Sequence, residues 1–230
     1  MLYIIPTPIG NLKDITLRAL EVLRFVDTII CEDTRRTGLL LSHYQIKKPL
    51  IVLNDYNEGR IFLEIVDRLK SGENLALVSD AGTPLVSDPG YKLIRECLQQ
   101  GIAVDSLPGP SSILPALTLS GLPPDKFMFL GYPPEKESHR LKLFQNVHDR
   151  EQNDYMKVTY ILFVSPHKLV KILQDMQEVF GDMEIILAKE LTKIHQSVKG
   201  QKISEWLEEL KNPAAGGPKG EYVLIFRLPG

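Results

Sequence analysis

Several side chains that could do chemistry stand directly behind short apolar runs. Asp33 follows one such run and precedes Arg35 and Arg36, and Asp80 follows another. A carboxylate in such a place can accept a proton, bind an ammonium group or satisfy the turn in which it lies. The two arginines suit phosphate, because a planar guanidinium forms bidentate bonds to phosphate oxygens. These residue types point to a small-molecule site, with ordinary turn and solvated-surface roles as the alternative.

Three loops that contain glycine or proline lie between an apolar run and a helical pattern. They comprise residues 6–11, 79–90 and 107–112. Gly82, Gly90 and Gly109 allow the backbone to approach a ligand at little steric cost. Ligands of open α/β sheets bind beyond the carboxyl ends of the strands, so loops in these positions should line one crevice. Each loop alone is an ordinary connection, but the three together predict a shared site.

The sequence lacks the patterns of several common enzyme classes. It contains no G-x-G-x-x-G fingerprint for a dinucleotide, no G-x-x-x-x-G-K-[ST] phosphate loop and no G-x-S-x-G nucleophile elbow. The histidines are scattered without ligand spacing, and neither Cys31 nor Cys97 belongs to a metal-binding pair. We therefore expect no metal, and nicotinamide, ATP and serine-nucleophile chemistry are disfavoured.

Composition limits the partners and the compartment. The chain of 230 residues has a formal net charge of −2, so no overall basic field indicates nucleic acid. A nucleic acid would need local patches, for which Arg35 with Arg36, the run 136–142, and Lys168 with Lys171 are candidates, although each suits an ordinary solvated face. The absence of a membrane-length apolar stretch and of a leader pattern, with two apolar-flanked cysteines, predicts a soluble cytoplasmic protein.

The elements that must position these loops alternate between strand and helix. Apolar runs predict strands at 2–5, 28–31, 50–53, 75–79 and 102–107, with helical patterns between them, which favours a parallel sheet. Asp14 or Thr16 can cap the helix after the first loop. In the helix before the last of these strands, Asp88 can cap, Pro89 suits the first position and Gly101 can close it.

The segment 121–134 carries two Pro-Pro pairs, and we place a domain boundary near Gly121. Beyond it, strands are predicted at 160–164, 184–188 and 222–226. Ser165 and Pro166 should begin a helix that closes at Gly181, and Ser204 should cap a short helix that carries Trp206. The segment 212–220 is predicted to be a flexible loop.

At this level of detail the chain resembles a known family along its whole length. The strings that carry the resemblance are LYIIPTPIGNLKDITLRALEVL, CEDTRRTGLLL, NDYNE, LVSDAGTPLVSDPGYKL, LPGPSS, AKELTKIH and KGEYVLI. They closely resemble the ribosomal RNA small subunit methyltransferase I family of the tetrapyrrole methylase superfamily. The family differs from the chain at Val164, because members typically carry a glutamate before the Ser-Pro-His string. Many members also continue beyond the last strand into a helical extension.

The resemblance implies an α/β fold of two domains, residues 1–121 with a mostly parallel sheet and residues 122–230 with a mixed sheet. It implies a homodimer that binds S-adenosylmethionine in the cleft between the domains and methylates the ribose 2′-hydroxyl of a cytidine in 16S rRNA of the small ribosomal subunit. The cofactor residues that it implies are Pro8, Ile9, Gly10, Asp80, Gly82, Thr83, Val86, Ser111, Ser112, Val164 and Ala188.

A ribose hydroxyl is a weak acid, so a nearby carboxylate or lysine could take its proton. The candidates are Asp33, Glu58, Lys189 and Glu190, and the sequence does not choose between them. Arg35 and Arg36 are the candidates for RNA phosphate contacts. Methylation of a tetrapyrrole or another substrate on the same fold, and a non-enzymatic RNA-binding module, are the alternatives.

Overall fold

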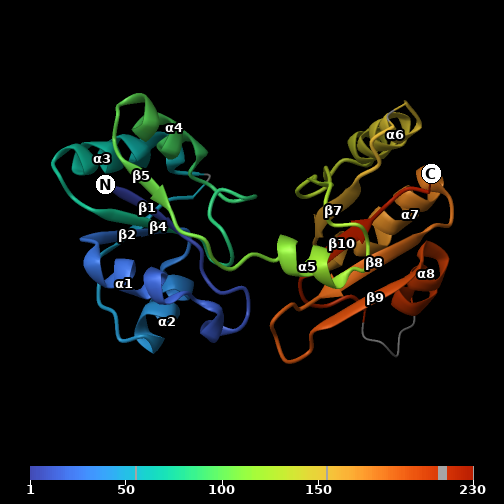
Figure 1. Ribbon diagram of the computed structural model, residues 1–230, viewed down its shortest axis with the longest axis horizontal. Helices are drawn as coiled ribbons and strands as arrows, with labels where there is room; N and C mark the ends of the chain where they lie inside the picture. Colours follow the sequence, from blue (N-terminus) through green and yellow to red (C-terminus); the bar gives the residue numbers. More distant parts are fainter. Residues whose placement is uncertain (55, 154, 212–216, 230) are drawn as a thin grey trace. The chain divides into compact units, whose positions relative to one another are not determined.

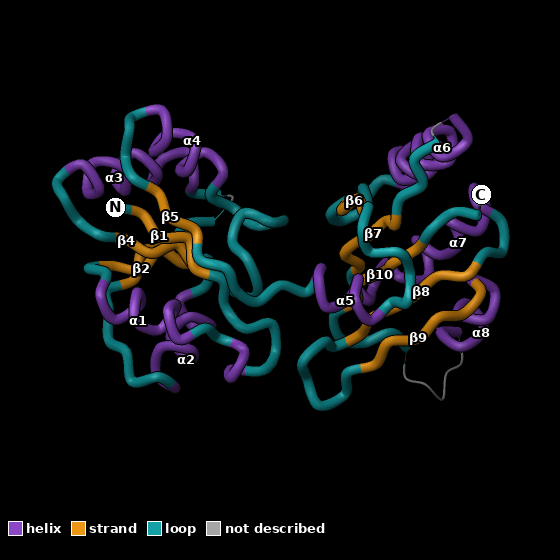
Figure 2. Tube along the Cα trace, in the orientation of Figure 1, coloured by secondary structure: helices purple, strands orange, loops and turns teal. Residues whose placement is uncertain are grey.

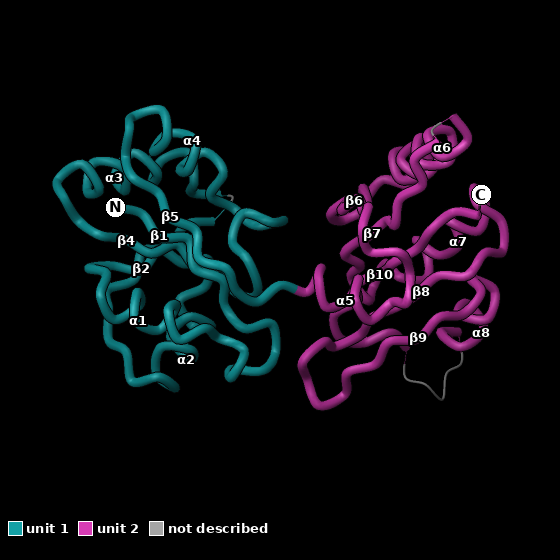
Figure 3. Tube along the Cα trace, viewed as in Figure 1, with its two compact units in different colours: residues 1–111 teal, residues 112–230 magenta. Residues whose placement is uncertain are grey.

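A computed structural model describes residues 1–54, 56–153, 155–211 and 217–229 of the chain. The chain divides into two compact units, Met1–Ser111 and Ser112–Gly230 (Figure 3). The division lies earlier than the boundary expected near Gly121, because helix α5 (Ile113–Leu119) contacts strand β10 (Tyr222–Phe226) of the second unit. The Pro-Pro pairs therefore lie inside the second unit.

The first unit is built on a parallel sheet of five strands. They are β1 (Leu2–Ile5), β2 (Thr28–Cys31), β3 (Leu50–Val52), β4 (Leu75–Val78) and β5 (Val104–Ser106). The order across the sheet is β3-β2-β4-β1-β5, and every pairing is parallel. The predicted parallel sheet is confirmed. Because β4, β1 and β5 are neighbours, the three loops that follow them start from the same edge of the sheet.

Helices cover both faces of this sheet (Figure 1). They are α1 (Leu17–Phe25) and α2 (Thr34–His43) on one face and α3 (Glu58–Lys70) and α4 (Tyr91–Gln99) on the other, with a 3-10 turn at Leu12–Asp14. The buried side chains of α1 and α2 and the sheet residues that face them form one core cluster, which includes Leu23 and Ile29. Those of α3 and α4 form another with the opposite face of the sheet, which includes Ile65 and Leu93. Burial on both faces explains why the inner strands β1, β2 and β4 are unbroken apolar runs in the sequence.

The second unit holds a mixed sheet with the order β6-β7-β10-β8-β9 (Figure 2). Its other strands are β6 (Phe127–Phe129), β7 (Thr159–Val164), β8 (Glu184–Lys189) and β9 (Ser197–Lys202). Only the β6–β7 pairing is parallel among the described strands of this sheet. One core cluster joins it to α6 (Glu137–Asn153), α7 (Leu169–Phe180) and α8 (Ile203–Lys211), and a 3-10 turn at Pro166–Lys168 precedes α7. The predicted mixed sheet is confirmed.

A buried ion pair joins α6 to α7. The Arg140 guanidinium contacts the Asp175 carboxylate and donates to the carbonyls of Pro134 and Glu135. Only 4% of the Arg140 side chain is exposed. Lys168, which belongs to another basic candidate of the sequence, forms an ion pair with Glu135. The basic run 136–142 is therefore a weaker phosphate site than its composition indicates, because its arginine is already used inside the unit.

Some predicted helix ends are confirmed and others are wrong. Thr16 caps α1 by accepting from the Ala19 N–H, and Gly101 and Gly181 follow α4 and α7 with φ of +68° and +77°. Asp88 does not cap α4, because the N-cap residue is Gly90.

Two serines differ from the predicted capping roles. Ser204 lies inside α8 and bonds Asp182, because the helix begins one residue earlier. Ser165 has the predicted N-cap position, but its side chain makes no capping hydrogen bond. Most of the predicted loop 212–220 lies outside the described residues. No helix in the described ranges has the length and apolarity needed to cross a membrane.

Candidate functional site

The three loops at the carboxyl edge of the first sheet are tied together by hydrogen bonds. Thr7 and Gly82 exchange two backbone bonds, with N···O distances of 2.8 and 2.9 Å. The Ser79 hydroxyl donates to the Gly82 carbonyl at 3.0 Å, and the Thr83 hydroxyl donates to the Pro110 carbonyl at 3.0 Å. The predicted convergence of these loops is therefore confirmed. They form one fixed surface on the first unit.

Gly82 is the point where these loops come closest. Its φ is +88°, in the region that favours glycine. A Cβ at this residue would lie 3.5 Å from the Ile9 side chain and 4.0 Å from the Pro110 carbonyl. Side chains larger than a methyl group would therefore push the loops apart or fill the surface that they form.

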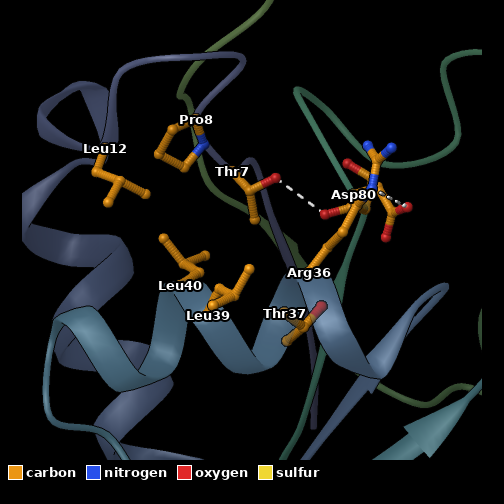
Figure 4. Close-up of a pocket in the computed structure, with 9 residues that line it drawn as sticks. Thr7, Pro8, Leu12, Arg36, Thr37, Leu39, Leu40 and Asp80 are labelled. Atoms are coloured by element: carbon orange, nitrogen blue, oxygen red, sulfur yellow. Dashed lines mark hydrogen bonds and ion pairs between the residues drawn. The ribbon is translucent and has the colours of Figure 1, made fainter.

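A pocket of about 110 Å³ opens beside the first two loops and α2 (Figure 4). It is lined by Thr7, Pro8, Leu12, Arg36, Thr37, Leu39, Leu40, Ser79 and Asp80. Figure 4 shows the leucines and Pro8 toward one end and Arg36 with Asp80 at the other. The pocket is much smaller than the ~300 Å³ or more of a site that holds a whole drug-sized ligand. It can take only a part of such a molecule.

Four charged side chains lie at the start of α2. Asp33 is the N-cap residue: it accepts from the Arg35 N–H at 2.8 Å and pairs with the Arg35 guanidinium at 2.7 Å. These bonds lower the pKa of Asp33 to about 2. Asp80 accepts from the Asp33 N–H at 3.2 Å, and its carboxylate lies 3.5 Å from the Arg36 Nε. Burial raises the pKa of Asp80, and the nearby Arg36 charge opposes that rise.

The loop from Asp80 to Gly90 has an unusual backbone. Leu85 and Ser87 have φ of +73° and +68°, and Gly90 has φ of +119°. Non-glycine residues in this region cost about 1–3 kcal/mol each and persist only where the surroundings hold them. A Cβ on Gly90 would lie 2.9 Å from the Leu85 side chain and 3.1 Å from that of Leu77. The loop is therefore packed closely upon itself.

Glu58 holds the far end of this loop. Its carboxylate is nearly buried and accepts from the Gly90 N–H at 3.0 Å and the Lys92 N–H at 3.4 Å. It also pairs with the Lys92 ammonium at 3.1 Å. Glu58 thus does for α4 what Asp88 was expected to do: it satisfies N–H groups that have no partner in the first turn. A carboxylate held in this way acts on the loop rather than as a free proton acceptor.

In the second unit, the predicted site residues lie at the ends of β7 and β8. Val164 and Ala188 are buried strand residues. The Lys189 ammonium lies 5.7 Å from the centre of the Tyr222 ring. Glu190 has φ of +50° and accepts from the Glu221 N–H at 2.8 Å and from the Lys193 ammonium at 2.9 Å. These bonds, that from Glu221 first, lower the pKa of Glu190.

The remaining predicted residues are spread along the loops. Pro8, Ile9 and Gly10 follow β1 and are half-buried or exposed, and Val86 is exposed on the strained loop. Ser111 ends the first unit and Ser112 is the N-cap residue of α5. The first unit thus brings most predicted cofactor residues to one edge. Among the pocket residues, Pro8, Asp80 and Arg36 were predicted, whereas Leu12 and the α2 residues Thr37, Leu39 and Leu40 were not, because no chemically reactive group marks them in the sequence.

Comparison with known proteins first defines the class. A family model described as Tetrapyrrole (Corrin/Porphyrin) Methylases matches residues 1–206. Among solved structures, diphthine synthase aligns with a TM-score of 0.72 and 14% identity, covering 99% of this chain and 89% of that one. Uroporphyrin-III-C-methyltransferase from Thermus thermophilus aligns with a TM-score of 0.65 and 18% identity, covering 97% and 93%. These structures show the shared fold.

Relatives with higher identity define the family more narrowly. The ribosomal RNA small subunit methyltransferase I of Haemophilus influenzae is 46% identical over 98% of this chain and 77% of its own length. The protein of that name from Thermotoga maritima is 43% identical over 98% of this chain and 97% of its own length. The chain therefore belongs to the ribosomal RNA small subunit methyltransferase I family within the tetrapyrrole methylases. It is a methyltransferase, and its methyl donor is S-adenosylmethionine.

Proposed function

We propose that the protein transfers a methyl group from S-adenosylmethionine to the 2′-hydroxyl of a cytidine in 16S rRNA of the small ribosomal subunit. Identity above 40% over 98% of the chain to proteins named for ribosomal RNA methylation carries this proposal. The loop edge of the first unit supports it, since it offers fixed backbone groups and an adjoining small pocket. Such a substrate would place the protein in the cytoplasm.

The described residues suit the donor. We assign its contacts to the loop residues of the first unit (Pro8, Ile9, Gly10, Gly82, Thr83, Val86 and Ser111, with Asp80 at their margin) and to Ser112, Val164 and Ala188 of the second. Gly82 supports the assignment, because its backbone carries no side chain at the point where the loops converge. The donor supplies a methyl group that its sulfonium already activates. The protein's task is then to align the hydroxyl oxygen with that methyl group and to exclude water.

The four candidate proton acceptors differ in their availability. Asp33, Glu58 and Glu190 are each held in hydrogen bonds within the protein, and the pKa of Asp33 and that of Glu190 are lowered. A lowered pKa weakens a carboxylate as a base. We therefore propose that these three residues shape the site, and that the hydroxyl proton leaves late, after attack on the methyl group has begun. Lys189 is the remaining candidate and should be tested by substitution with alanine and with arginine.

Methyl transfer from labelled S-adenosylmethionine tests the function. Small ribosomal subunits should accept one label per subunit, at a ribose 2′-oxygen of cytidine, whereas uroporphyrinogen and elongation factor should accept none. Gly82→Trp should abolish transfer by blocking the loops, and calorimetry should find one donor per chain for the wild type. Label only in the porphyrinoid or the elongation factor would replace the proposed substrate, and RNA binding without any transfer would favour a binding module.

A further inference from the structure

We propose that the pocket beside α2 holds the base of the target nucleotide, and that Asp80 with Arg36 selects an aminopyrimidine there. This inference rests on the proposed function and adds to it a recognition site. Its evidence is the size of the pocket, the order of charges at its polar end and the apolar surface opposite them.

The size of the pocket decides how much of a ligand can enter. Its volume is about 110 Å³, and it is partly open to solvent. A closed cavity of about 150 Å³ holds a benzene molecule. An open pocket of this size therefore suits one six-membered ring and is too small for a complete donor molecule. A pyrimidine is a single six-membered ring and matches this volume more closely than the two fused rings of adenine do, so we assign the pocket to the substrate base.

The polar end of the pocket presents an acceptor beside a donor. The Asp80 carboxylate lies 3.5 Å from the Arg36 Nε, and the Asp80 side chain is 22% exposed. Cytosine carries an amino donor next to ring and carbonyl acceptors, in the matching order. Uracil has a carbonyl oxygen in place of the amino group and an N–H in place of the ring acceptor. In the same position, the uracil carbonyl oxygen would face the Asp80 carboxylate and the uracil N–H would face the Arg36 guanidinium. Neither pair could form a hydrogen bond, because one has two acceptors and the other has two donors.

The other end of the pocket offers an apolar surface to the ring. Leu40 is buried, but Leu39 and Leu12 are 74% and 38% exposed while lining the pocket. A base that covers them would remove apolar surface from water, at roughly 25 cal/mol per Å². Arg35 does not compete for this position, because its guanidinium is bonded to Asp33. Arg36 is therefore the arginine of this pair that can face the base.

A base-substitution experiment tests the pocket. Small subunits assembled on rRNA with cytidine or with uridine at the target position serve as substrates, and kcat/KM is measured for each. The wild type should prefer cytidine by about 10- to 100-fold, as a good pair of base contacts provides. Asp80→Asn should reduce this preference to a few fold, because an amide can donate to the uracil oxygen as well as accept from the cytosine amino group. The preference is a ratio of two kcat/KM values for the same enzyme, so any weakening of the donor contact assigned to Asp80 cancels from it.

Two further variants keep the test decisive. Leu39→Trp should fill the pocket from an exposed position and abolish transfer while donor binding persists, even if Asp80→Asn does not fold. Arg24→Ala, which removes an exposed arginine of α1 in the same unit, is the control and should behave as the wild type. Full cytidine preference in Asp80→Asn, or full activity in Leu39→Trp, overturns the pocket assignment. A wild type that methylates neither substrate overturns the proposed function itself.

Discussion

Asp33 and Arg35 form an ion pair with each other at the start of α2. Three side-chain bonds join the guanidinium to the carboxylate, although the Arg35 side chain is 88% exposed. A phosphate that approaches Arg35 must share this guanidinium with Asp33. We therefore propose that Arg35 contributes at most one phosphate contact, and that Asp33 sets its direction.

Arg35→Ala should weaken binding to small ribosomal subunits and leave donor affinity unchanged. The slope of log K against log salt should fall by about 0.7 to 0.9, the value for one phosphate contact. Arg35→Lys, which keeps the charge but loses the planar fork, is the matched control and should retain most of the slope. A wild-type slope in Arg35→Ala would mean that Arg35 contacts no phosphate and has only a structural role.

The same variant should change the titration of Asp33. Without its partner, the pKa of Asp33 should rise from about 2 toward the ordinary 3.8. A lowered carboxylate pKa stabilises the fold at pH values above the unfolded pKa, and this stabilisation is lost as the pH falls through the folded pKa. Arg35→Ala should thus be less stable than the wild type at neutral pH, and its stability should fall less as the pH is lowered through the titration of Asp33. Carboxyl chemical shifts and acid unfolding measure both effects, and an unchanged Asp33 pKa would contradict the pairing.

Gly90 and Gly101 allow backbone strain and side-chain crowding to be separated. Both have positive φ, but only Gly90 has side chains close to the position of an added Cβ. Gly101→Ala should destabilise the protein by about 1–2 kcal/mol through its backbone conformation. Gly90→Ala should destabilise it more and should also reduce donor affinity, because Leu85 must move. Urea unfolding and calorimetry provide the comparison, and equal effects of the two changes would mean that Leu85 yields without cost.

Among the elements, α4 depends on a residue of a different helix for its first turn. Glu58→Ala should lower the free energy of unfolding by about 1–3 kcal/mol, since it leaves a buried N–H without its charged acceptor. It should also raise the KM for the donor more than it lowers kcat, because the loop that it holds loses its fixed end. Lys92→Ala is the control: it removes only the exposed partner of Glu58 and should cost about 1 kcal/mol or less. A Glu58→Ala enzyme with the wild-type KM would show that the loop needs no such anchor.

The inner strands β1, β2 and β4 of the first sheet could be predicted closely, because burial on both faces makes each one a continuous apolar run. Helix α6 and strands β6 and β9 were missed for physical reasons. The core-facing side of α6 includes Arg140 and Glu151, so its apolar periodicity is weak. Strand β9 lies at an edge and has few apolar residues, and β6 has only three residues and lies in the segment that the Pro-Pro pairs mark as a boundary.

Parts of the candidate site were equally hard to foresee. The convergence of the three loops followed from strand order and was predicted. The capping of α4 by Glu58 was not, because the two segments are far apart in the sequence and the nearer Asp88 fits the local pattern. The pocket leucines also went unnoticed, because only the packing of α2 beside the first loop brings Leu39 and Leu40 next to Leu12 of the 3-10 turn.

At the scale of the whole molecule, the resemblance to the family predicts a homodimer. Light scattering should then give a mass of about 52 kDa, twice the 26.0 kDa of the chain, at micromolar concentrations. Measurements with and without the donor would show whether assembly depends on the donor. A mass near 26 kDa throughout the concentration range would contradict the dimer without affecting the proposed chemistry.

The edges of both sheets limit self-association of another kind. Strands β3 and β5 at the edges of the first sheet, and β6 at one edge of the second, have three residues each. The longer edge strand β9 carries Lys199 and Lys202. Short strands and edge lysines are poor templates for the addition of another strand. Concentrated solutions of the folded protein should accordingly resist fibre growth, and aggregation on heating should begin only after the strands of the sheet interiors are released.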